Sequence, residues 1–273
     1  MLAALWEGQL AAVAALRPAL PALAAAVVAA ADRLRQGGRL AYAGAGTSGR
    51  IGVQDGAELG PTFDWPAERL LFLMAGGESA LIRATEGAED RADVAEQDVR
   101  DARLGAADVL VGIAASGVTP YTVAAVAAAR RAGALTIGVA NSAGGALLAA
   151  AEHAILVETG PEAIAGSTRM KAGTAQKATL NLFSTAVMTR LGRVYRGQMV
   201  DMNARNDKLR RRALRMLRSL TGCGTDQAAA ALAQTEGRVK PAVLVVRGLS
   251  AAEATALLAR FDGDLRQAER SLA

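Results

Sequence analysis

Two glycine-containing loops carry hydroxyl side chains in an arrangement that suits the binding of a phosphate group. The first, Gly-Ala-Gly-Thr-Ser-Gly at residues 44–49, follows an apolar run and has the spacing G-x-G-x-x-G. The second, Ala-Ser-Gly-Val-Thr-Pro at residues 115–120, follows another apolar run, and its proline suits the first turn of a helix. Glycine permits tight turns, and the N-terminus of a following helix presents free N–H groups to an anion. The candidate phosphate ligands in these loops are Gly46, Thr47, Ser48, Gly49, Ser116, Gly117 and Thr119.

The first loop fits either a dinucleotide or the phosphate of a small sugar. A dinucleotide-binding fold places an acidic residue about 20 residues beyond the glycines, at the end of the second strand, to hold the ribose. That offset falls near Arg69, before the second apolar run begins. The dinucleotide interpretation is therefore the weaker one, and a phosphate monoester that meets both loops fits better. For each hydroxyl taken alone, the competing interpretation is that it only caps a helix.

The composition further limits the kinds of reaction and ligand that the sequence could support. The 273 residues are 52% hydrophobic, which is enough for one large domain with an appendage or for two modest domains. A lone Cys223 excludes an intramolecular disulfide framework, and a lone His153 makes a histidine-rich metal site or a Ser-His-Asp triad hard to build. Catalysis would then rest on carboxylates, hydroxyls and backbone amides, with no metal. The net charge of +5 suits an anionic ligand, whereas 3% aromatic residues leave few platforms for stacking nucleic-acid bases.

The alanine-rich opening, residues 1–37, has the apolar character of a membrane span but is interrupted too often to be read as one. We expect it to form cytoplasmic helices that pack against the rest of the protein, without a membrane-spanning segment. The interrupting residues are Glu7, Arg17, Pro18, Pro21, Asp32, Arg33 and Arg35.

Apolar strand-like runs alternate with helix-like segments through the middle of the chain. Strands that are apolar throughout and separated by helices indicate a parallel sheet covered on both faces. The sequence therefore predicts a doubly wound α/β fold with a mainly parallel five-stranded sheet, in which ligands bind at the carboxyl ends of the strands. The predicted strands are 39–44, 70–75, 108–115, 135–140 and 153–158, and the predicted helices between them are 48–60, 79–103, 120–133 and 145–151.

Beyond the sheet, residues 170–191 read as one long helix, and short helical pieces follow from Asn206. Ser250 and Glu253 match the S-x-x-E pattern of a capping box at the start of a helix. The basic run at residues 208–218 has apolar residues at Leu209, Leu214 and Leu217, which favours an amphipathic helix over a nucleic-acid patch. We therefore divide the chain into N-terminal helices (1–37), an α/β domain (38–205) and a small helical domain (206–273).

Five ordered motifs resemble those of the N-acetylmuramic acid 6-phosphate etherase family, which belongs to the sugar isomerase (SIS) superfamily of phosphosugar-binding proteins. The resemblance extends from about residue 38 to the end of the chain. The motifs are Gly-Ala-Gly-Thr-Ser-Gly-Arg at 44–50, Asp-Gly-Ala-Glu at 55–58 with Pro-Thr-Phe at 61–63, Glu-Gly-Ala-Glu-Asp at 86–90, Gly-Ile-Ala-Ala-Ser-Gly at 112–117 with Thr-Pro-Tyr at 119–121, and Gly-Ser-Thr-Arg-Met-Lys-Ala-Gly-Thr-Ala-Gln-Lys at 166–177.

The resemblance implies an enzyme that cleaves the D-lactyl ether of N-acetylmuramic acid 6-phosphate during cell-wall recycling. The products are N-acetylglucosamine 6-phosphate and D-lactate, formed by elimination and then hydration without a metal or organic cofactor. The resemblance also implies a SIS domain, a C-terminal module similar to ubiquitin-associated domains, and a homodimer whose active site lies near the subunit interface.

The family's catalytic carboxylates align with two residues of this chain, Glu58 as the acid and Glu89 as the base. An acid role calls for a pKa above the ordinary 4.3 of glutamate, which we expect from burial of Glu58 between Ala57 and Leu59. The resemblance further places the hydroxyls of the two loops around the phosphate, and it places Glu162 and Ser167 in the sugar site. Lys171 would add positive charge nearby or form a surface ion pair.

Two other functions share the same domain type. A regulatory SIS protein would bind the phosphosugar without turnover, and it would need the hydroxyl loops but not the pair Glu58 and Glu89. An aldose-ketose phosphosugar isomerase would share proton abstraction at C2 but would release no lactate. Lactate release therefore distinguishes the etherase from both alternatives.

Overall fold

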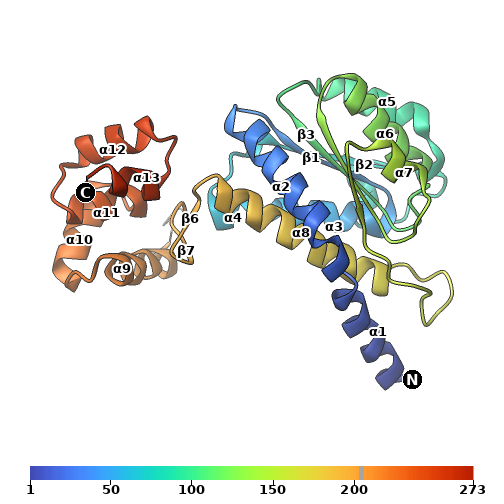
Figure 1. The fold of residues 1–273 in the computed structure, drawn as a ribbon, viewed down its shortest axis with the longest axis horizontal. Helices are drawn as coiled ribbons and strands as arrows, with labels where there is room; N and C mark the ends of the chain where they lie inside the picture. The colour runs from blue at the N-terminus through green and yellow to red at the C-terminus, as the bar shows by residue number, and fades with distance from the viewer. Residues whose placement is uncertain (203–205, 273) are drawn as a thin grey trace. The chain divides into compact units, whose positions relative to one another are not determined.

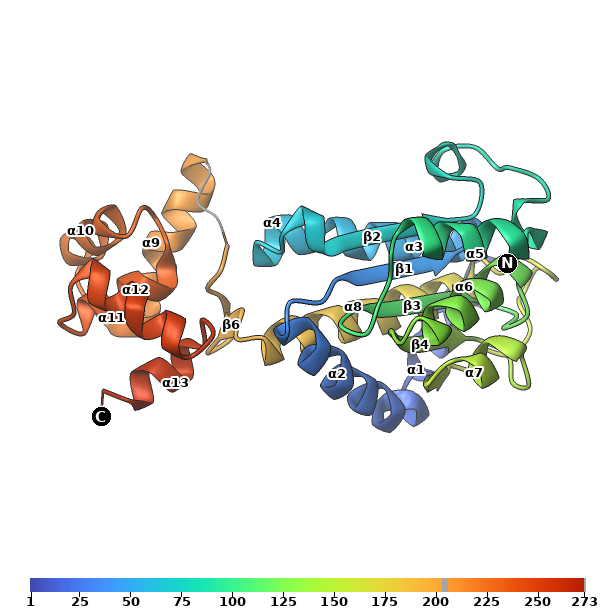
Figure 2. The same cartoon turned by 90° about the horizontal axis from the view of Figure 1, so that it is seen from above.

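The computed structural model describes residues 1–202 and 206–272, and its main feature is a five-stranded sheet in which all neighbouring strands are parallel. The strand order is β2-β1-β3-β4-β5, and Figure 2 shows β2, β1, β3 and β4 following one another across the sheet. The predicted doubly wound fold is confirmed. Each strand ends within two residues of its predicted bounds: β1 Leu40–Gly44, β2 Leu70–Met74, β3 Val109–Ala114, β4 Leu135–Ala140 and β5 His153–Leu156.

Helices cover both faces of this sheet, because strands that are apolar on both sides must be buried on both sides. On one face, α5 (Ala92–Asp101), α6 (Pro120–Arg131) and α7 (Ala146–Ala150) share a hydrophobic core with β1, β2 and β3. On the other face lie α2 (Leu20–Arg35) and α3 (Gly46–Ala57) (Figure 1). The helix that follows β1, α3, therefore lies on one face of the sheet, and the helix that follows β3, α6, lies on the opposite face.

Two glycines allow α3 to lie close to the sheet. A Cβ atom at Gly52 would be 3.0 Å from Ile113 Cδ1 and 3.1 Å from Tyr42 Cβ. At Gly56, a Cβ atom would be 2.5 Å from Cε1 of Phe72, which stacks on the ring of Tyr42. Side chains at these two positions would push α3 away from β1, so glycine here sets the position of the helix that follows the first loop.

The predicted helix over residues 79–103 is wrong in its first half. Only α5 at its end is an α-helix, and residues 78–91 contain two short 3-10 turns, η3 (Glu78–Leu81) and η4 (Ala88–Asp90). Gly77 and Gly87 both have φ of 71°, a left-handed conformation that glycine adopts readily and that interrupts a right-handed helix. The segment that carries Glu89 is therefore a loop.

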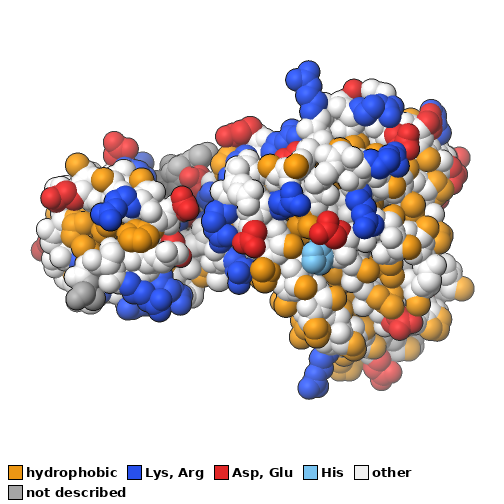
Figure 3. Space-filling view, turned by 45° about the horizontal axis from the view of Figure 1, so that its top comes forward, with side chains coloured by type: hydrophobic (Ala, Val, Ile, Leu, Met, Phe, Trp, Pro, Cys, Tyr) orange, Lys and Arg blue, Asp and Glu red, His pale blue; other side chains and the backbone are white. Residues whose placement is uncertain are grey.

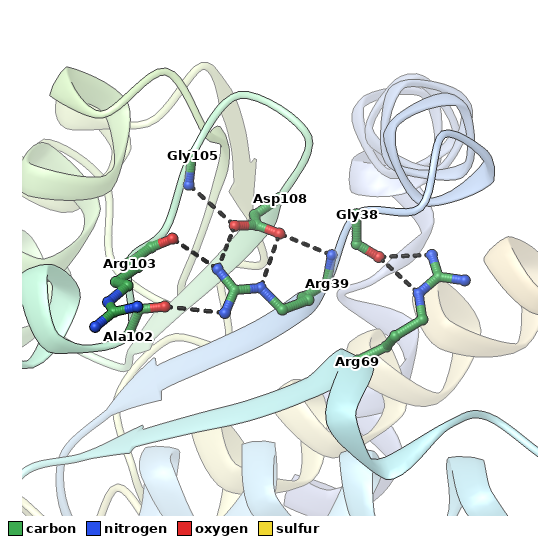
Figure 4. Close-up of polar contacts among 7 residues, drawn as sticks. All are labelled: Gly38, Arg39, Arg69, Ala102, Arg103, Gly105 and Asp108. Atoms are coloured by element: carbon green, nitrogen blue, oxygen red, sulfur yellow. Dashed lines mark hydrogen bonds and ion pairs between the residues drawn. The ribbon is translucent and has the colours of Figure 1, made fainter.

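A partly buried ion pair, in which Asp108 is buried and Arg39 is half-buried, joins the beginnings of β1 and β3, at the opposite end of the sheet from the two glycine loops. The Arg39 guanidinium donates to Asp108 at 2.7 and 3.2 Å and also donates to the carbonyls of Ala102 and Arg103 (Figure 4). The Asp108 carboxylate also accepts the backbone N–H groups of Arg39 and Gly105. Burial alone would raise the pKa of Asp108, but these hydrogen bonds outweigh it and lower the pKa.

We expect Asp108→Asn to lower the free energy of unfolding at pH 7 by about 3 kcal/mol, because it leaves the Arg39 guanidinium without its charge partner. The lowered pKa of Asp108 means that its stabilisation is complete above the unfolded-state value near 3.9 and is lost as the pH falls through the folded-state value. Urea unfolding at pH 7 and at pH 3 measures both effects, and the difference between variant and wild type should shrink at pH 3.

The control is Asp32→Asn, which removes an exposed ion pair with Arg35 and should cost less than about 1 kcal/mol. Equal losses of stability in Asp108→Asn and Asp32→Asn would contradict the larger contribution expected of the Arg39–Asp108 pair.

The N-terminal segment forms α1 (Leu2–Ala14), the turn η1 (Arg17–Ala19) and α2. Helix α2 buries six side chains and contacts β3, β4 and β5, as expected for a helix that packs on the sheet. Helix α1 buries only Ala12, and a hydrogen bond between Gln9 and Thr174 attaches it to the rest of its unit. By length and composition alone, Leu2–Arg35 could cross a membrane, with a mean hydropathy of 1.8 and 33% of the apolar window buried.

The chain divides into two compact units, one comprising Met1–Ala57 and Pro66–Val187, the other comprising Glu58–Trp65 and Met188–Ala273. The second unit has a hydrophobic core of its own among its described helices. The domain boundary predicted between residues 205 and 206 adjoins residues 203–205, which lie outside the described part of the chain. The helices of this unit are α4 Leu59–Phe63, α9 Asp207–Thr221, α10 Thr225–Gln234, α11 Val239–Val246, α12 Ala251–Arg260 and α13 Leu265–Arg270.

Two sequence signals in this second unit are confirmed, and one element was missed. The predicted capping box is present at the start of α12. The Ser250 hydroxyl accepts the backbone N–H of Glu253, and the Glu253 carboxylate accepts the backbone N–H of Ser250. The basic helix α9 is amphipathic and buries Leu217 with its neighbours. The short hairpin of β6 (Val194–Tyr195) and β7 (Gln198–Met199) was not predicted, although the Arg-Gly turn between its strands has positive φ at both residues, as a type I′ turn requires.

Candidate functional site

The two glycine loops leave the sheet side by side. Strands β1 and β3 are hydrogen-bonded neighbours, and Gly44 at the end of β1 pairs with Ile113. The helices that follow β1 and β3 lie on opposite faces of the sheet. The carboxyl ends of these two strands therefore form the topological switch point, where doubly wound sheets bind ligands. The sheet therefore places both predicted phosphate loops at the position that the fold favours for a ligand.

The first loop is closely packed against the end of its own strand. A Cβ atom at Gly49 would lie 2.3 Å from the Met74 sulfur and 2.7 Å from the Gly44 carbonyl oxygen, so only glycine fits there. Gly46 has φ of 54° and begins α3, whose first N–H groups have no partner within the helix. The Ser48 side chain is buried, whereas Thr47 is half-buried and reaches the surface. Thr47 is thus the more accessible of the two hydroxyl residues in this loop.

The second loop turns at Gly117, whose φ is 71°. The Ser116 hydroxyl accepts the backbone N–H of Val118 at 3.2 Å within the loop, and Ser116 remains exposed. Thr119 occupies the N-cap position of α6, yet its hydroxyl accepts no capping hydrogen bond. The interpretation that the Thr119 hydroxyl caps this helix is therefore wrong, and the residue is half-buried.

A cavity of about 280 Å³ lies between the first loop and the segment that carries Glu89. It brings together Gly46 and Thr47 of the loop with Glu89, which is exposed and forms no hydrogen bond or ion pair with other described residues. The second loop does not line this cavity. The complete lining is Ala45, Gly46, Thr47, Arg50, Met74, Ala75, Ala80, Ala84, Thr85, Glu86, Gly87, Ala88 and Glu89.

Arg50 connects the two walls of this cavity and was not among the predicted site residues. Its guanidinium donates two hydrogen bonds, at 3.0 and 2.8 Å, to the carbonyl oxygen of Ala80. One residue on α3 thereby holds the start of the loop that leads to Glu89. The only sequence signal for this role was that Arg50 ends the first glycine-rich motif, which says nothing about its partner.

Glu58 differs from the expectation for an acid. It directly follows α3 and precedes α4, and its side chain is exposed, as is that of Ala57, while Leu59 alone is buried. The predicted burial of Glu58 is therefore wrong for this chain by itself. Its carboxylate caps no helix and forms no hydrogen bond or ion pair with other described residues, and it belongs to the second compact unit, whereas Glu89 belongs to the first.

Glu162 has a structural role that the sequence did not indicate. Its two carboxylate oxygens accept the backbone N–H groups of Lys171 and Ala172, at 2.9 and 3.0 Å, at the N-terminus of α8 (Lys171–Arg190). A carboxylate at this end of a helix is favoured by the helix dipole. The Lys171 ammonium donates to the Pro161 carbonyl at 2.9 Å and forms no ion pair with the described residues, so the alternative of a surface ion pair is not observed. Ser167 is half-buried in the same loop.

A buried carboxylate, Asp55, joins α3 to β1 and α8. It accepts hydrogen bonds from Tyr42 at 2.8 Å, Asn181 at 2.7 Å and Ser184 at 3.1 Å. Burial, together with the adjacent Asp55 carboxylate, raises the pKa of Tyr42 well above its usual value, so the phenol remains a donor. Because Asp55 lies one helical turn before Glu58, this network fixes the end of α3 from which Glu58 emerges.

Acidic and basic side chains are intermixed on the face of the protein drawn in Figure 3, with no continuous basic stripe on that face. Among the described residues, no three histidine, cysteine, aspartate or glutamate side chains come together as metal ligands would.

Comparison with known proteins identifies close relatives over almost the whole chain. Residues 92–186 match the SIS domain family, and residues 22–130 match the family described as glucokinase regulatory protein N-terminal SIS domain. The chain is 51% identical to the N-acetylmuramic acid 6-phosphate etherase of Deinococcus radiodurans, a match that covers 98% of this chain and 88% of that protein. It is 48% identical to the N-acetylmuramic acid 6-phosphate etherase of Streptomyces avermitilis, over 93% of this chain and 82% of that protein.

Among solved structures, a phosphoheptose isomerase from Francisella tularensis has a similar fold. The TM-score is 0.52 at 20% sequence identity, and the match covers 69% of this chain and 96% of the isomerase. At this identity the likeness shows a shared fold and not a shared activity.

Proposed function

The chain belongs to the N-acetylmuramic acid 6-phosphate etherase family, and we propose that it performs the etherase reaction with Glu89 as the base and Glu58 as the acid. The activity is that of a carbon-oxygen lyase acting on the D-lactyl ether of N-acetylmuramic acid 6-phosphate. The observation that supports the proposed mechanism is that Thr47, a proposed phosphate-binding residue, and Glu89, whose carboxylate has no partner among the described residues, line the same cavity.

The proposed chemistry proceeds in two stages. Glu89 removes the proton from C2 of the ring-opened sugar, and the C3–oxygen bond then breaks as Glu58 protonates the departing lactate. Water adds across the resulting C2=C3 double bond, with its oxygen on C3 and a proton on C2, to give N-acetylglucosamine 6-phosphate. The sum is one substrate and one water giving two products, so neither an oxidant nor a cofactor enters the balance.

The phosphate is held, in this proposal, by the two loops at the switch point. Backbone N–H groups at the start of α3 and the hydroxyls of both loops would meet the phosphate oxygens. Glu162 and Ser167 would line the sugar site, with Glu162 acting through the helix end that it caps. The phosphate ligands proposed are Gly46, Thr47, Ser48, Gly49, Ser116, Gly117 and Thr119.

We expect Thr119→Val to raise the KM for N-acetylmuramic acid 6-phosphate about tenfold with a smaller change in kcat, because one hydrogen bond to a charged phosphate is lost. The control is Thr122→Val on the same helix. Thr122 is fully buried, and its hydroxyl has no hydrogen-bond partner among the described residues, so this change should leave KM unaltered. Equal KM values for Thr119→Val and wild type would remove Thr119 from the phosphate site.

We further propose that the protein is a cytoplasmic homodimer with the active site near the subunit interface, as the family resemblance implies. The substrate is a small phosphosugar, and nucleic acid and membrane are not proposed as partners. The exposure of Glu58 in the single chain is compatible with this arrangement, because a partner subunit could cover it. Light scattering of the purified protein tests the dimer directly.

The test of the proposed function is D-lactate release from N-acetylmuramic acid 6-phosphate by purified protein dialysed against a chelator. Stoichiometric lactate and N-acetylglucosamine 6-phosphate support the etherase and a reaction that needs no metal. A folded protein that binds the phosphosugar but releases no lactate would instead indicate a regulatory SIS protein.

A further inference from the structure

A second cavity, of about 470 Å³, lies within the C-terminal unit and takes no part in the proposed reaction. It is formed by the β6–β7 hairpin, the residue after α11, and α13, and all of its lining comes from the same compact unit. We call it the arginine hollow, because four of its six lining residues are arginines: Tyr195, Arg196, Arg247, Arg266, Glu269 and Arg270.

The charges of the arginine hollow do not balance. The four arginines and one glutamate leave a net charge of +3 on the lining residues. Glu269 is already engaged, since it accepts hydrogen bonds from the Arg247 guanidinium at 3.3 Å and from the Tyr195 hydroxyl. No described carboxylate pairs with Arg266 or Arg270, both of which are exposed. Like charges gathered around one cavity repel one another, and an anion relieves that repulsion.

The Tyr195 ring, which lines the arginine hollow, holds two of its four arginines close together. The Tyr195 ring is buried at 6% exposure, and the guanidinium carbons of Arg196 and Arg266 lie 5.2 and 5.9 Å from its centroid. Guanidinium groups held over an aromatic ring are restrained without losing their N–H donors, which remain free at the edges of the guanidinium plane. The hollow thus presents several positioned donor groups to one ligand.

Phosphate is the anion that this arrangement fits, because the arginine fork matches phosphate oxygens in bidentate fashion. One phosphate monoester carries about −1.5 to −2 at pH 7, which is less than the local +3. We propose that the arginine hollow binds a small anion carrying two linked phosphate groups. The cavity volume lies within the roughly 300–1,000 Å³ range of small-molecule sites. The diphosphate can come from free pyrophosphate or from a nucleoside diphosphate.

Calorimetric titration of the full-length protein with pyrophosphate at low salt tests this inference. The hollow variant is Arg266→Gln with Arg270→Gln, which leaves the Glu269 hydrogen bonds intact. The matched control is Arg211→Gln with Arg212→Gln, which removes the same charge from exposed positions on α9. We expect one pyrophosphate site in wild type and control, weakened at least tenfold in the hollow variant. Equal weakening in the hollow variant and the control would overturn the inference, since it would indicate unspecific attraction.

Titrations with two further anions define the ligand. Inorganic phosphate should bind at least tenfold more weakly than pyrophosphate, and equal affinities would overturn the requirement for two phosphates. Adenosine diphosphate that binds more tightly than pyrophosphate would identify a nucleotide as the source, whereas equal affinities would identify the diphosphate alone. Pyrophosphate binding that is lost in Thr119→Val but kept in the hollow variant would place the ligand in the proposed phosphosugar site and overturn the inference. Thermal unfolding verifies that every variant is folded.

Discussion

Replacing Glu89 with glutamine should lower kcat/KM for D-lactate release by roughly 100- to 10,000-fold, the contribution of a general base. Glutamine keeps the size of the side chain but cannot accept the C2 proton. Because Glu89 forms no hydrogen bond or ion pair with other described residues, the change should leave the thermal midpoint almost unaltered, so the loss would be one of chemistry and not of folding. Lactate release and thermal unfolding, measured on the same preparation, distinguish a loss of catalysis from a loss of folded protein.

The matched control for Glu89 is Asp90→Asn, on the same 3-10 turn. Asp90 is also exposed, but it does not line the cavity. Activity should therefore be close to that of wild type. If Asp90→Asn and Glu89→Gln lost activity equally, the loss would reflect the charge of the loop, and the assignment of Glu89 as the base would be wrong.

Replacing Glu58 with glutamine should lower lactate release by a similar factor, roughly 100- to 10,000-fold, for a different reason. Glutamine cannot give a proton to the departing lactate, but proton removal at C2 would still proceed. In deuterium oxide, Glu58→Gln should exchange the C2 hydrogen of recovered substrate for deuterium while releasing little lactate. Nuclear magnetic resonance of the recovered sugar measures this exchange.

The exchange experiment assigns the two glutamates separately. Glu89→Gln should lose both exchange and lactate release, whereas Glu58→Gln should lose only the release. The reverse pattern would exchange the roles of acid and base. Loss of exchange in both variants, with the substrate still bound, would show that Glu58 also acts before the C–O bond breaks and would contradict the stepwise scheme.

The contacts of Arg50 explain why the cavity lined by Thr47 and Glu89 could not be predicted from the sequence alone. The two hydrogen bonds from Arg50 to the Ala80 carbonyl join a helix to a loop 30 residues further along the sequence. The composition of residues 79–103 predicted a helix. The left-handed Gly87 interrupts that helix instead, and the Glu89 segment lines one cavity with the first loop.

The role of Glu162 and the arginine hollow also depend on contacts between separate segments of the chain. The family resemblance placed Glu162 in the sugar site, and the structure adds that its carboxylate caps α8, a role that depends on where two separate segments meet. The four arginines of the hollow come from the β6–β7 turn, the end of α11 and α13, and they form no charge run in the sequence.

The sequence by itself determined the five parallel strands, the glycine loops after β1 and β3, and the family. Apolar runs, glycine spacing and ordered motifs are local properties, and each is written in consecutive residues. Only the tertiary structure decided that Thr47 and Glu89 share a cavity, that Glu58 is exposed and that Glu162 caps a helix. The physical reason is that burial, hydrogen-bond partners and cavities arise from packing between segments far apart in the chain, which residue spacing does not encode.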